Sequence, residues 1–423
     1  MTARGKGSPE QALDAGDVAS ICEAAAEEWR PDGKNVLFVI PDSTRTCPMD
    51  ILFGALYKAF APRVKKLDFL VALGTHPPMP EEAIHHMVGI TAREHGEKFA
   101  KASFFNHAWR DDSQLKAIGT IPAREIESIS ENRLKMDVTI TCNRMIESHD
   151  LIILVGPVFP HEVVGFSGGN KYLFPGIAGK EIIDFFHWLG ALITNREIIG
   201  KKRTPVRKVV DRAARFVEKE RRAFCLVVKE KHPAGIYYGT PEEAWSAAAD
   251  LSTVVNIHCT DRLYDTVLSQ APGMYDDLWT GGKAMYKLEP VTARGGRIII
   301  FAPHITEVSK VHGGVLLETG YHVRDFFLQQ WDKYKEYPWG ILAHSTHVKG
   351  MGGYSNNVED PWVDVILATG IPEDTCRRIN LGYMDWRNID VKEYSGREEE
   401  GILYVPRAGE TLYRYCQKSY ENG

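Results

Sequence analysis

The first 230 residues alternate short apolar runs with amphipathic stretches, and this alternation restricts the fold more than any other feature of the sequence. The apolar runs have the length and composition of strands, and they lie at 35–41, 67–73, 138–142, 151–155 and 224–228. After the first run, apolar residues recur at helical spacing over 51–61. Strands that alternate with helices predict an α/β fold with a doubly wound parallel sheet.

A second, smaller α/β domain is expected to follow the first. We place the first domain at 1–260 and the second at 261–394. Within the second, 296–303 predicts a strand, 339–345 is a candidate for another, and 350–357 has the composition of a loop. The tail, 395–423, is expected to return to the first domain as a strand and a helix.

Composition restricts the class of ligand. The 423 residues carry a formal net charge of -5, which gives no general basic surface for nucleic acid or anionic lipid. No run approaches the length of a membrane span, and the polar N-terminus has no apolar signal core. We therefore expect a cytoplasmic protein that binds a small molecule, with no nucleic-acid or membrane partner. The number of subunits stays open.

The seven cysteines show none of the short paired spacings of disulfide scaffolds or zinc ribbons. We expect them to be reduced and mostly structural. They are Cys22, Cys47, Cys142, Cys225, Cys259, Cys376 and Cys416.

The segment 161–187 sets two histidines and a lysine around a Ser-Gly-Gly run. Paired glycines let a backbone approach a ligand and aim its amides at anionic oxygens, and Lys171 follows at once. The segment follows the apolar run 151–159, so His161 lies just past the carboxyl end of a predicted strand. Open parallel sheets place their ligand sites at that edge.

Two other loops follow predicted strands directly, at 42–45 and 74–76. A parallel sheet would bring them to the same edge as His161, facing a common cleft. Hydroxyl groups near a helix N-terminus suit a phosphate, and these are Ser43 and Thr44. Arg45 can clamp a phosphate or carboxylate with two parallel hydrogen bonds, and His76 and His161 are candidates for proton transfer.

Each of these residues also has a purely structural interpretation. Asp42 is a suitable helix cap, and Lys283, after two glycines, fits a surface helix. His187, between aromatic residues, fits a buried helical histidine with satisfied hydrogen bonds. Lys171 fits an ordinary phosphate-binding lysine, but its segment departs from the G-x4-G-K-[ST] loop in spacing and ending, which argues against ATP.

Other histidines are assigned structural roles. His344 and His347 are three residues apart in a loop-like stretch with no third ligand nearby in sequence. His85 and His86 are adjacent on a predicted helix, where neighbouring side chains diverge by about 100° and cannot chelate together.

Five motifs in fixed order resemble the lactate racemase family of nickel-pincer-nucleotide enzymes, over nearly the whole chain. They are DSTR at 42–45, GTH at 74–76, the H-x9-K spacing from His161 to Lys171, PGIAG at 175–179, and His187 sixteen residues beyond Lys171. The resemblance implies a Rossmann-like nucleotide-binding domain, here 1–260, with the smaller domain contributing to the substrate cleft.

The resemblance also implies a cofactor. In the family, the lysine matching Lys171 is joined through a thioamide to a pyridinium-3,5-bisthiocarboxylic acid mononucleotide, whose two sulfurs and one ring carbon hold Ni(II). The histidine matching His187 supplies the fourth ligand, which agrees with the preference of Ni(II) for imidazole and soft sulfur donors. The matching loop, Asp42 to Arg45, is assigned to the cofactor. Separate maturation proteins assemble it and are implied partners.

The implied reaction is reversible inversion at C2 of a 2-hydroxy acid. The histidines matching His76 and His161 would stand on opposite faces of C2 and move the hydroxyl proton while hydride passes to the cofactor and back. Lys283 matches a lysine that holds the substrate, and Arg45 would share its carboxylate.

This chain departs from the lactate enzyme near the substrate. Trp279 and Thr280 stand where that enzyme has tyrosine and glutamine, and Pro77 stands where it has an arginine. The shorter Thr280 would open room beyond C3, whereas Trp279 would equally close it, and these residues alone do not decide between the two effects. Our hypothesis is that Thr280 lines a site for a larger 2-hydroxy acid, such as an aldonic acid. The alternatives are lactate racemase proper, a non-catalytic nucleotide-binding relative, and a metal-independent dehydrogenase or lyase. The last lacks support, because no G-x-G-x-x-G follows a predicted strand.

Overall fold

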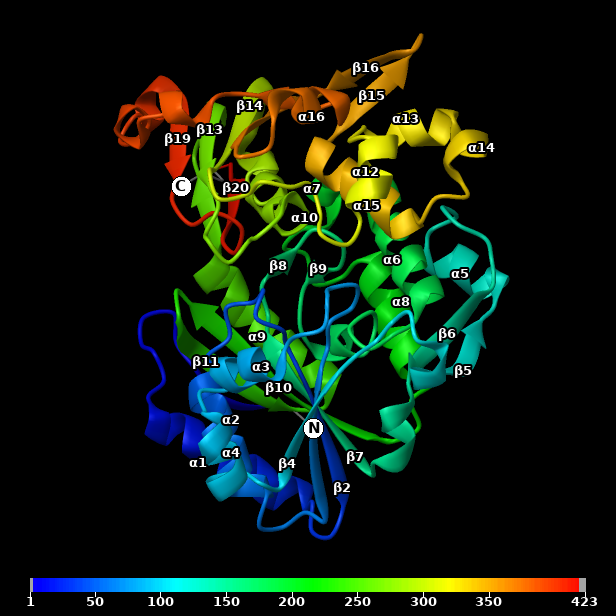
Figure 1. Ribbon diagram of the computed structural model, residues 1–423, viewed down its shortest axis with the longest axis vertical. Coiled ribbons are helices and arrows are strands. Elements are labelled where there is room, and N and C mark those ends of the chain that lie inside the picture. Colours follow the sequence, from blue (N-terminus) through cyan, green and yellow to red (C-terminus); the bar gives the residue numbers. More distant parts are fainter. Residues whose placement is uncertain (1–2, 418–423) are drawn as a thin grey trace, which may run out of the picture. The chain divides into compact units, whose positions relative to one another are not determined.

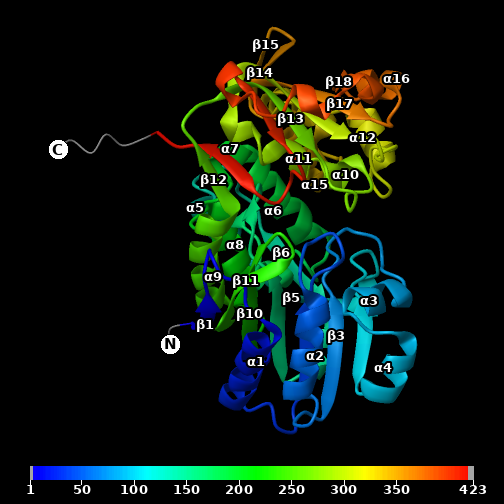
Figure 2. The same ribbon diagram turned by 90° about the vertical axis from the view of Figure 1, so that its left-hand side faces the viewer.

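The computed structural model describes residues 3–417, which form two compact units (Figures 1 and 2). The first unit comprises the described residues up to 159, together with 166–183 and 202–255. The second comprises 160–165, 184–201 and the described residues from 256 onwards. The chain is a mixed α/β protein, and none of its described helices has the length and apolar character needed to cross a membrane.

A seven-stranded sheet organises the first unit, in the order β1-β11-β10-β7-β2-β3-β4. The five strands from β10 to β4 are parallel, and β11 and β1 extend one edge in antiparallel fashion. Four of the five predicted strands of the first domain are confirmed in this sheet. The strand bounds are β1 (Arg4–Gly7), β2 (Asn35–Ile40), β3 (Lys66–Val71), β4 (Ala102–Asn106), β7 (Leu151–Pro157), β10 (Glu220–Lys229) and β11 (His232–Gly239).

Helices α1 (Ala15–Trp29) and α2 (Met49–Phe60) pack against one face of this sheet (Figure 2). Helix α1 begins at a capping box in which the Asp14 side chain accepts the backbone N–H of Asp17. Aromatic rings from the helices and strands interlock on that face, among them Trp29, Phe38, Phe53, Phe60, Phe69 and Phe224. The central strands are buried on both faces, which explains why they are continuous apolar runs.

The predicted strand at 138–142 exists but lies outside the main sheet. As β6 (Val138–Asn143) it pairs antiparallel with β5 (Leu115–Ile121), flanking α5 (Ala123–Ile129). Its side chains alternate between buried and half-buried, the pattern of a strand with only one covered face. Helices α3 (Glu81–Met87), α4 (Ala92–Lys98), α8 (Pro205–Ala214) and α9 (Pro241–Asn256) complete the larger elements of this unit.

A five-stranded parallel sheet organises the second unit, in the order β18-β17-β14-β13-β19. The predicted strand at 296–303 is confirmed as part of β14. The bounds are β13 (Tyr264–Gln270), β14 (Thr292–Ala302), β17 (Val363–Thr369), β18 (Gly382–Tyr383) and β19 (Ile402–Val405). Helices α12 (Gly313–Thr319), α13 (Arg324–Gln329), α14 (Trp331–Tyr334) and α16 (Glu373–Arg378) also belong to this unit.

The strand proposed at 339–345 is wrong, because these residues form helix α15 (Trp339–Lys349). Eight consecutive residues of this helix, 341–348, are buried. Burial on every side removes the polar face that would reveal a helical period, so the sequence resembles a buried strand. Gly350, at φ 84°, ends the helix.

The predicted return of the tail to the first domain is also wrong. Strand β19 pairs with β13, and β20 (Leu412–Tyr415) pairs with β12 (Ile257–Thr260), all within the second unit. The expected final helix is not found among the described tail residues, and 418–423 lie outside them. The local apolar pattern identified strands here but carries no information about their partners.

The cysteines are not all reduced. Cys259 and Cys416 form a disulfide between β12 and the residue after β20, across a sequence separation of 157. Such a pairing depends on strands brought together by the fold, so spacing along the chain could not reveal it. The other five cysteines are free.

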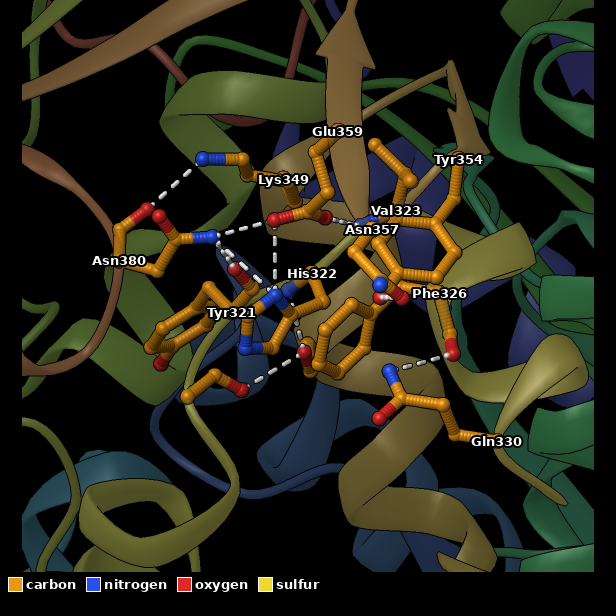
Figure 3. A network of polar contacts seen from close by, with 12 residues as sticks. Tyr321, His322, Val323, Phe326, Gln330, Lys349, Tyr354, Asn357, Glu359 and Asn380 are labelled. Atoms are coloured by element: carbon orange, nitrogen blue, oxygen red, sulfur yellow. Dashed lines mark hydrogen bonds and ion pairs between the residues drawn. The ribbon is translucent and has the colours of Figure 1, made fainter.

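The loop expected at 350–357 is largely a hairpin, formed by β15 (Gly352–Ser355) and β16 (Val358–Pro361). Asn356 and Asn357 form its turn at positive φ. A polar network ties the hairpin to the rest of the unit (Figure 3). Glu359 accepts hydrogen bonds from the Val323 backbone (2.8 Å), His322 Nδ1 (2.8 Å) and Asn380 Nδ2 (2.7 Å).

This network predicts acid-sensitive stability. Burial raises the pKa of Glu359, but the His322, Val323 and Lys349 interactions outweigh it and leave the pKa below its usual value. The stabilisation is therefore present above the unfolded-state pKa of about 4.3 and is lost as the pH falls below it. At pH 7 we expect Glu359→Gln to lower the free energy of unfolding by about 1–3 kcal/mol, measured by urea titration. That difference should shrink as the pH is lowered below about 4.

Glu373→Gln is the matched control. It removes an exposed carboxylate whose partner is Arg377, so about 0–1 kcal/mol is expected. Equal losses in the two variants would show that the Glu359 network contributes nothing special.

Candidate functional site

The loop after β2 is organised around Asp42, which is buried. Asp42 Oδ1 accepts hydrogen bonds from the Thr44 hydroxyl (2.8 Å) and the Thr44 backbone N–H (3.2 Å). Its Oδ2 makes a short hydrogen bond with Nδ1 of His76, in the loop after β3. Asp42 does not cap α2, which follows Pro48 and has no side-chain cap. The structure thus pairs two residues that the sequence assigned to separate roles.

The Asp42–His76 pair has the electrostatics of a proton-transfer unit. Burial raises the pKa of the Asp42 carboxyl, but His76, Arg45 and the Thr44 hydroxyl outweigh it and hold the pKa well below its usual range. The ionised carboxylate keeps a proton on His76 Nδ1. Nε2 is then the nitrogen of the neutral ring that can accept a proton.

The loop at 74–76 is joined to the PGIAG segment. Gly74 adopts φ 56°, and its N–H donates to the Gly176 carbonyl (2.9 Å). Tyr172 lies beside the loop after β2. Burial raises the pKa of its phenol well above the usual value, the nearby Cys47 and Asp42 raise it further, and Arg45 opposes them. The first unit therefore gathers the loops at 42–45 and 74–76 and the turn that carries Lys171.

Lys171 lies in a short 3₁₀ turn, Gly169–Tyr172, and is half-buried. The preceding Asn170 anchors the turn, since its amide nitrogen donates to Asp211 (3.0 Å) and Glu242 (2.8 Å) and its oxygen accepts from Arg221 (3.0 Å). These contacts fix the backbone on which the lysine is carried.

The paired glycines before Lys171 do not leave the open approach expected from the sequence. Gly168 and Gly169 have φ of 83° and 59°, which favours glycine. A Cβ at Gly168 would lie 2.6 Å from Val158, and one at Gly169 would lie 2.9 Å from Trp245. The missing side chains therefore make room for protein neighbours rather than for a ligand.

His161 belongs to the second unit and is buried at the end of β8 (Pro160–His161). The Val163 backbone N–H donates to His161 Nδ1 (3.1 Å), and Glu162 Oε2 lies 3.2 Å from the same atom. A neutral His161 whose Nδ1 accepts this bond carries its proton on Nε2. Lys287 holds the strand in place by donating to the Pro160 carbonyl.

His187 lies on α6 (Lys180–Ile193) and is half-buried, with its ring 4.1 Å from that of Phe186. Other imidazoles are close. Burial, followed by the charges of His347, His312 and His187, lowers the pKa of His344 well below its usual value. His344 is therefore neutral, and it lies on buried α15 rather than in the loop expected from the sequence.

Trp279 lies between two of these histidines. Its ring centroid is 4.4 Å from that of His312 and 4.1 Å from that of His344. The adjacent Thr280 is buried in α10 (Leu278–Gly281), where its hydroxyl contacts the capping residue Asp277 (Oδ1, 3.0 Å). Thr280 thus has a local structural role beside any contact with substrate.

Lys283 is not the surface residue that its glycine neighbours would allow. It is buried at the start of α11 (Lys283–Tyr286), and its Nζ lies 4.7 Å from the centroid of the Tyr275 ring. A buried ammonium group suits an anion-binding role, because a bound anion offsets the cost of burying its charge.

The predicted site residues thus form two sets. The first unit carries Asp42, Ser43, Thr44, Arg45, His76 and Lys171, and the second carries His161, His187, Thr280 and Lys283. Ser43 is exposed, whereas Thr44 and Arg45 are half-buried.

Sequence reasoning missed His107, directly after β4, which donates from Nε2 to the Ala178 carbonyl (2.9 Å). Burial lowers its pKa to about 4, so it is a neutral support for the PGIAG segment.

Comparison with known proteins identifies the family. A model of the lactate racemase N-terminal domain matches residues 9–200. The chain is 26% identical over 287 residues to lactate racemase from Lactiplantibacillus plantarum, covering 65% of this chain and 62% of that protein. The chain belongs to the lactate racemase family. The resemblance found in the sequence motifs is therefore confirmed.

Other similar proteins differ in how closely they match. The chain is 28% identical to lactate racemase from Thermoanaerobacterium thermosaccharolyticum over 157 residues, which cover 36% of this chain and 31% of that protein. The matched regions thus span less than two thirds of either curated relative. A crystal structure from Thermotoga maritima superposes with a TM-score of 0.88 at 31% identity, covering 96% of this chain and 99% of that one. The T. thermosaccharolyticum lactate racemase apoprotein shares the fold, with a TM-score of 0.70 at 18% identity over 98% and 94% of the two chains.

Proposed function

We propose that this protein is a racemase or epimerase that inverts C2 of a 2-hydroxy acid, using a nickel-pincer nucleotide attached to Lys171. The observation that carries the proposal is the pairing of buried Asp42 with half-buried His76, in the unit that also holds the Lys171 turn. Together they combine a proton-transfer group with a half-buried primary amine, in a chain of the lactate racemase family.

The residues present suit such a cofactor. Lys171 offers the amine for the thioamide. The loop from Asp42 to Arg45 offers hydroxyl groups and a guanidinium for a phosphate, and it precedes α2, whose first amides have no side-chain cap. His187 offers a half-buried imidazole as a ligand for Ni(II). When bound, the nickel-pincer nucleotide would supply the site that accepts hydride from C2 and returns it.

The chain's own residues would perform the proton transfers and the positioning. His76 Nε2 takes the hydroxyl proton of one enantiomer while Asp42 stabilises the imidazolium that forms. His161 performs the same task for the other enantiomer from the opposite face, in the tautomer that carries its proton on Nδ1, 3.2 Å from Glu162 Oε2, and leaves the lone pair of Nε2 to accept a proton. Lys283 and Arg45 hold the substrate carboxylate, so that C2 stays in place while its configuration inverts. Each proton returns to substrate oxygen, and the net redox change is zero.

Asp42 should act through His76, and Asp42→Asn tests this. We expect kcat to fall roughly 10- to 1,000-fold with little change in KM, because an amide neither fixes the tautomer nor stabilises the protonated ring. The acidic limb of the kcat/KM profile should move to lower pH. Chiral chromatography across a pH series measures both effects.

Asp68→Asn is the matched control. Asp68 is buried in β3 and pairs with His149 (3.0 Å), away from the strand-end loops. Asp68→Asn should lower the free energy of unfolding but leave the pH profile of kcat/KM unchanged. If Asp42→Asn behaves in the same way, Asp42 is only structural.

We propose further that the substrate is larger than lactate, with an aldonic acid among the candidates. Support comes from Thr280, whose short side chain is engaged by Asp277 and cannot reach out as glutamine would. Trp279 acts in the opposite direction, because its ring is bulkier than the tyrosine of the lactate enzyme. Enantiopure lactate, malate, phenyllactate and gluconate should be compared by chiral chromatography. We expect a larger acid to exceed lactate at least ~10-fold in kcat/KM, a factor typical of one pocket contact. Fastest turnover of lactate would contradict this proposal.

A further inference from the structure

Three metal-binding side chains meet in the first unit, outside the residues proposed for catalysis. Glu81 and His85 lie on α3, and His95 lies on α4. Their ligand atoms are all within 4.8 Å of one another. We propose that these three residues bind a divalent cation of the zinc class.

The separations suit a tetrahedral ion. His85 Nε2 lies 3.1 Å from His95 Nδ1 and 3.7 Å from Glu81 Oε1. With Zn–N and Zn–O bonds of about 2.0–2.2 Å, neighbouring ligand atoms are about 3.3–3.5 Å apart. The two imidazoles therefore need to move by only a few tenths of an ångström. The Glu81 side chain is 76% exposed and can rotate toward the ion.

The helices present the ligands from one direction. Glu81 and His85 are four residues apart, so they share a face of α3. Both imidazole rings pack against the Phe104 ring of β4, with ring-centroid distances of 5.9 Å for His85 and 5.4 Å for His95. This packing orients the rings before any ion binds, which lowers the entropic cost of binding.

The hydrogen bonds fix the required tautomer of His95. Its Nε2–H donates to the Ala102 carbonyl (2.8 Å), which leaves the lone pair of Nδ1 directed at His85. A backbone carbonyl on the outer nitrogen is the usual partner of a metal-bound histidine. Binding then requires His85 to carry its proton on Nδ1 instead of Nε2. Both rings stay neutral, and no proton is released.

Two imidazoles and one carboxylate favour Zn²⁺, Ni²⁺ or Cu²⁺ over Mg²⁺ and Ca²⁺, which prefer all-oxygen sites. The exposed side next to Glu81 leaves the fourth position to water, so the ion should exchange with solvent. Bound metal would link α3 to α4. It would also stabilise the position of α3, which begins five residues after His76.

Zinc binding to the full-length chain tests the proposal. Protein made without maturation proteins and freed of metal by a chelator is titrated with Zn²⁺ against a chromophoric competitor. The titration is repeated in His187→Ala, which removes the other proposed ligand. We expect one Zn²⁺ per chain in both proteins. We also expect affinity losses of at least ~100-fold in His85→Gln and His95→Gln and about 10-fold in Glu81→Gln.

His86→Gln is the matched control, because His86 neighbours His85 on the same helix but is exposed. It should bind as tightly as the wild type. If a substitution of the buried His85 prevents folding, Glu81→Gln still tests the site, since its side chain is exposed. A zinc anomalous diffraction peak between the three side chains would give direct support. Absence of bound Zn²⁺ in the wild type, or equal affinity in Glu81→Gln, His85→Gln and the wild type, would overturn the proposal.

Discussion

Replacing Lys171 with arginine should abolish racemisation, with a loss of at least ~10⁴-fold, and should also abolish covalent cofactor attachment. Arginine keeps the positive charge and most of the length of lysine, but its guanidinium does not provide the primary amine that a thioamide requires. The turn itself should survive, because Asn170 anchors it through Asp211, Glu242 and Arg221. Activity is measured by chiral chromatography and attachment by intact mass, both after co-expression with the maturation proteins.

Lys180→Arg is the control for this experiment, because Lys180 is a nearby exposed lysine at the start of α6. It should retain both the adduct and activity. An active Lys171→Arg protein, or one with a normal adduct at another residue, would refute the assigned attachment point.

His76→Gln should lower kcat by about 10²- to 10⁴-fold, the usual contribution of a general acid or base. Glutamine can still hydrogen-bond Asp42, but it cannot accept and return a proton. The adduct on Lys171 should persist, so mass spectrometry separates loss of catalysis from loss of cofactor. His161→Gln should have an effect of the same order.

The exposed His86 provides the control for general effects of removing an imidazole, and His86→Gln should be fully active. If His76→Gln retains more than about a tenth of the wild-type kcat, His76 is not the base.

The sequence predicted the fold best where local patterns are determined by burial. Strands β2, β3, β7 and β10 are covered on both faces over most of their length, so they are mainly apolar runs, with Asp68 in β3 as a buried exception. Helix α15 is buried on every side and lost its helical period for the same reason. The positions of β19 and β20, and the Cys259–Cys416 disulfide, depend on pairing with distant strands that leave no local signal.

The candidate site shows a similar division. Individual loops could be predicted from their position after strands, but the link between Asp42 and His76 arises because β2 and β3 are adjacent and parallel. The glycines before Lys171 were assigned to a ligand from composition alone, whereas the structure fills their space with Val158 and Trp245. His85 was considered only with its sequence neighbour, although its structural partner, His95, lies ten residues away.

Attachment of the cofactor to Lys171 is best tested by intact mass, peptide mapping and nickel analysis of wild-type protein co-expressed with the cofactor maturation proteins. Chelator treatment beforehand removes exchangeable metal, including any held by the cluster on α3 and α4. We expect a nucleotide adduct on the Lys171 peptide and one nickel per chain. An unmodified Lys171 under these conditions would contradict it and favour a non-catalytic nucleotide-binding relative or a different enzyme on the same fold.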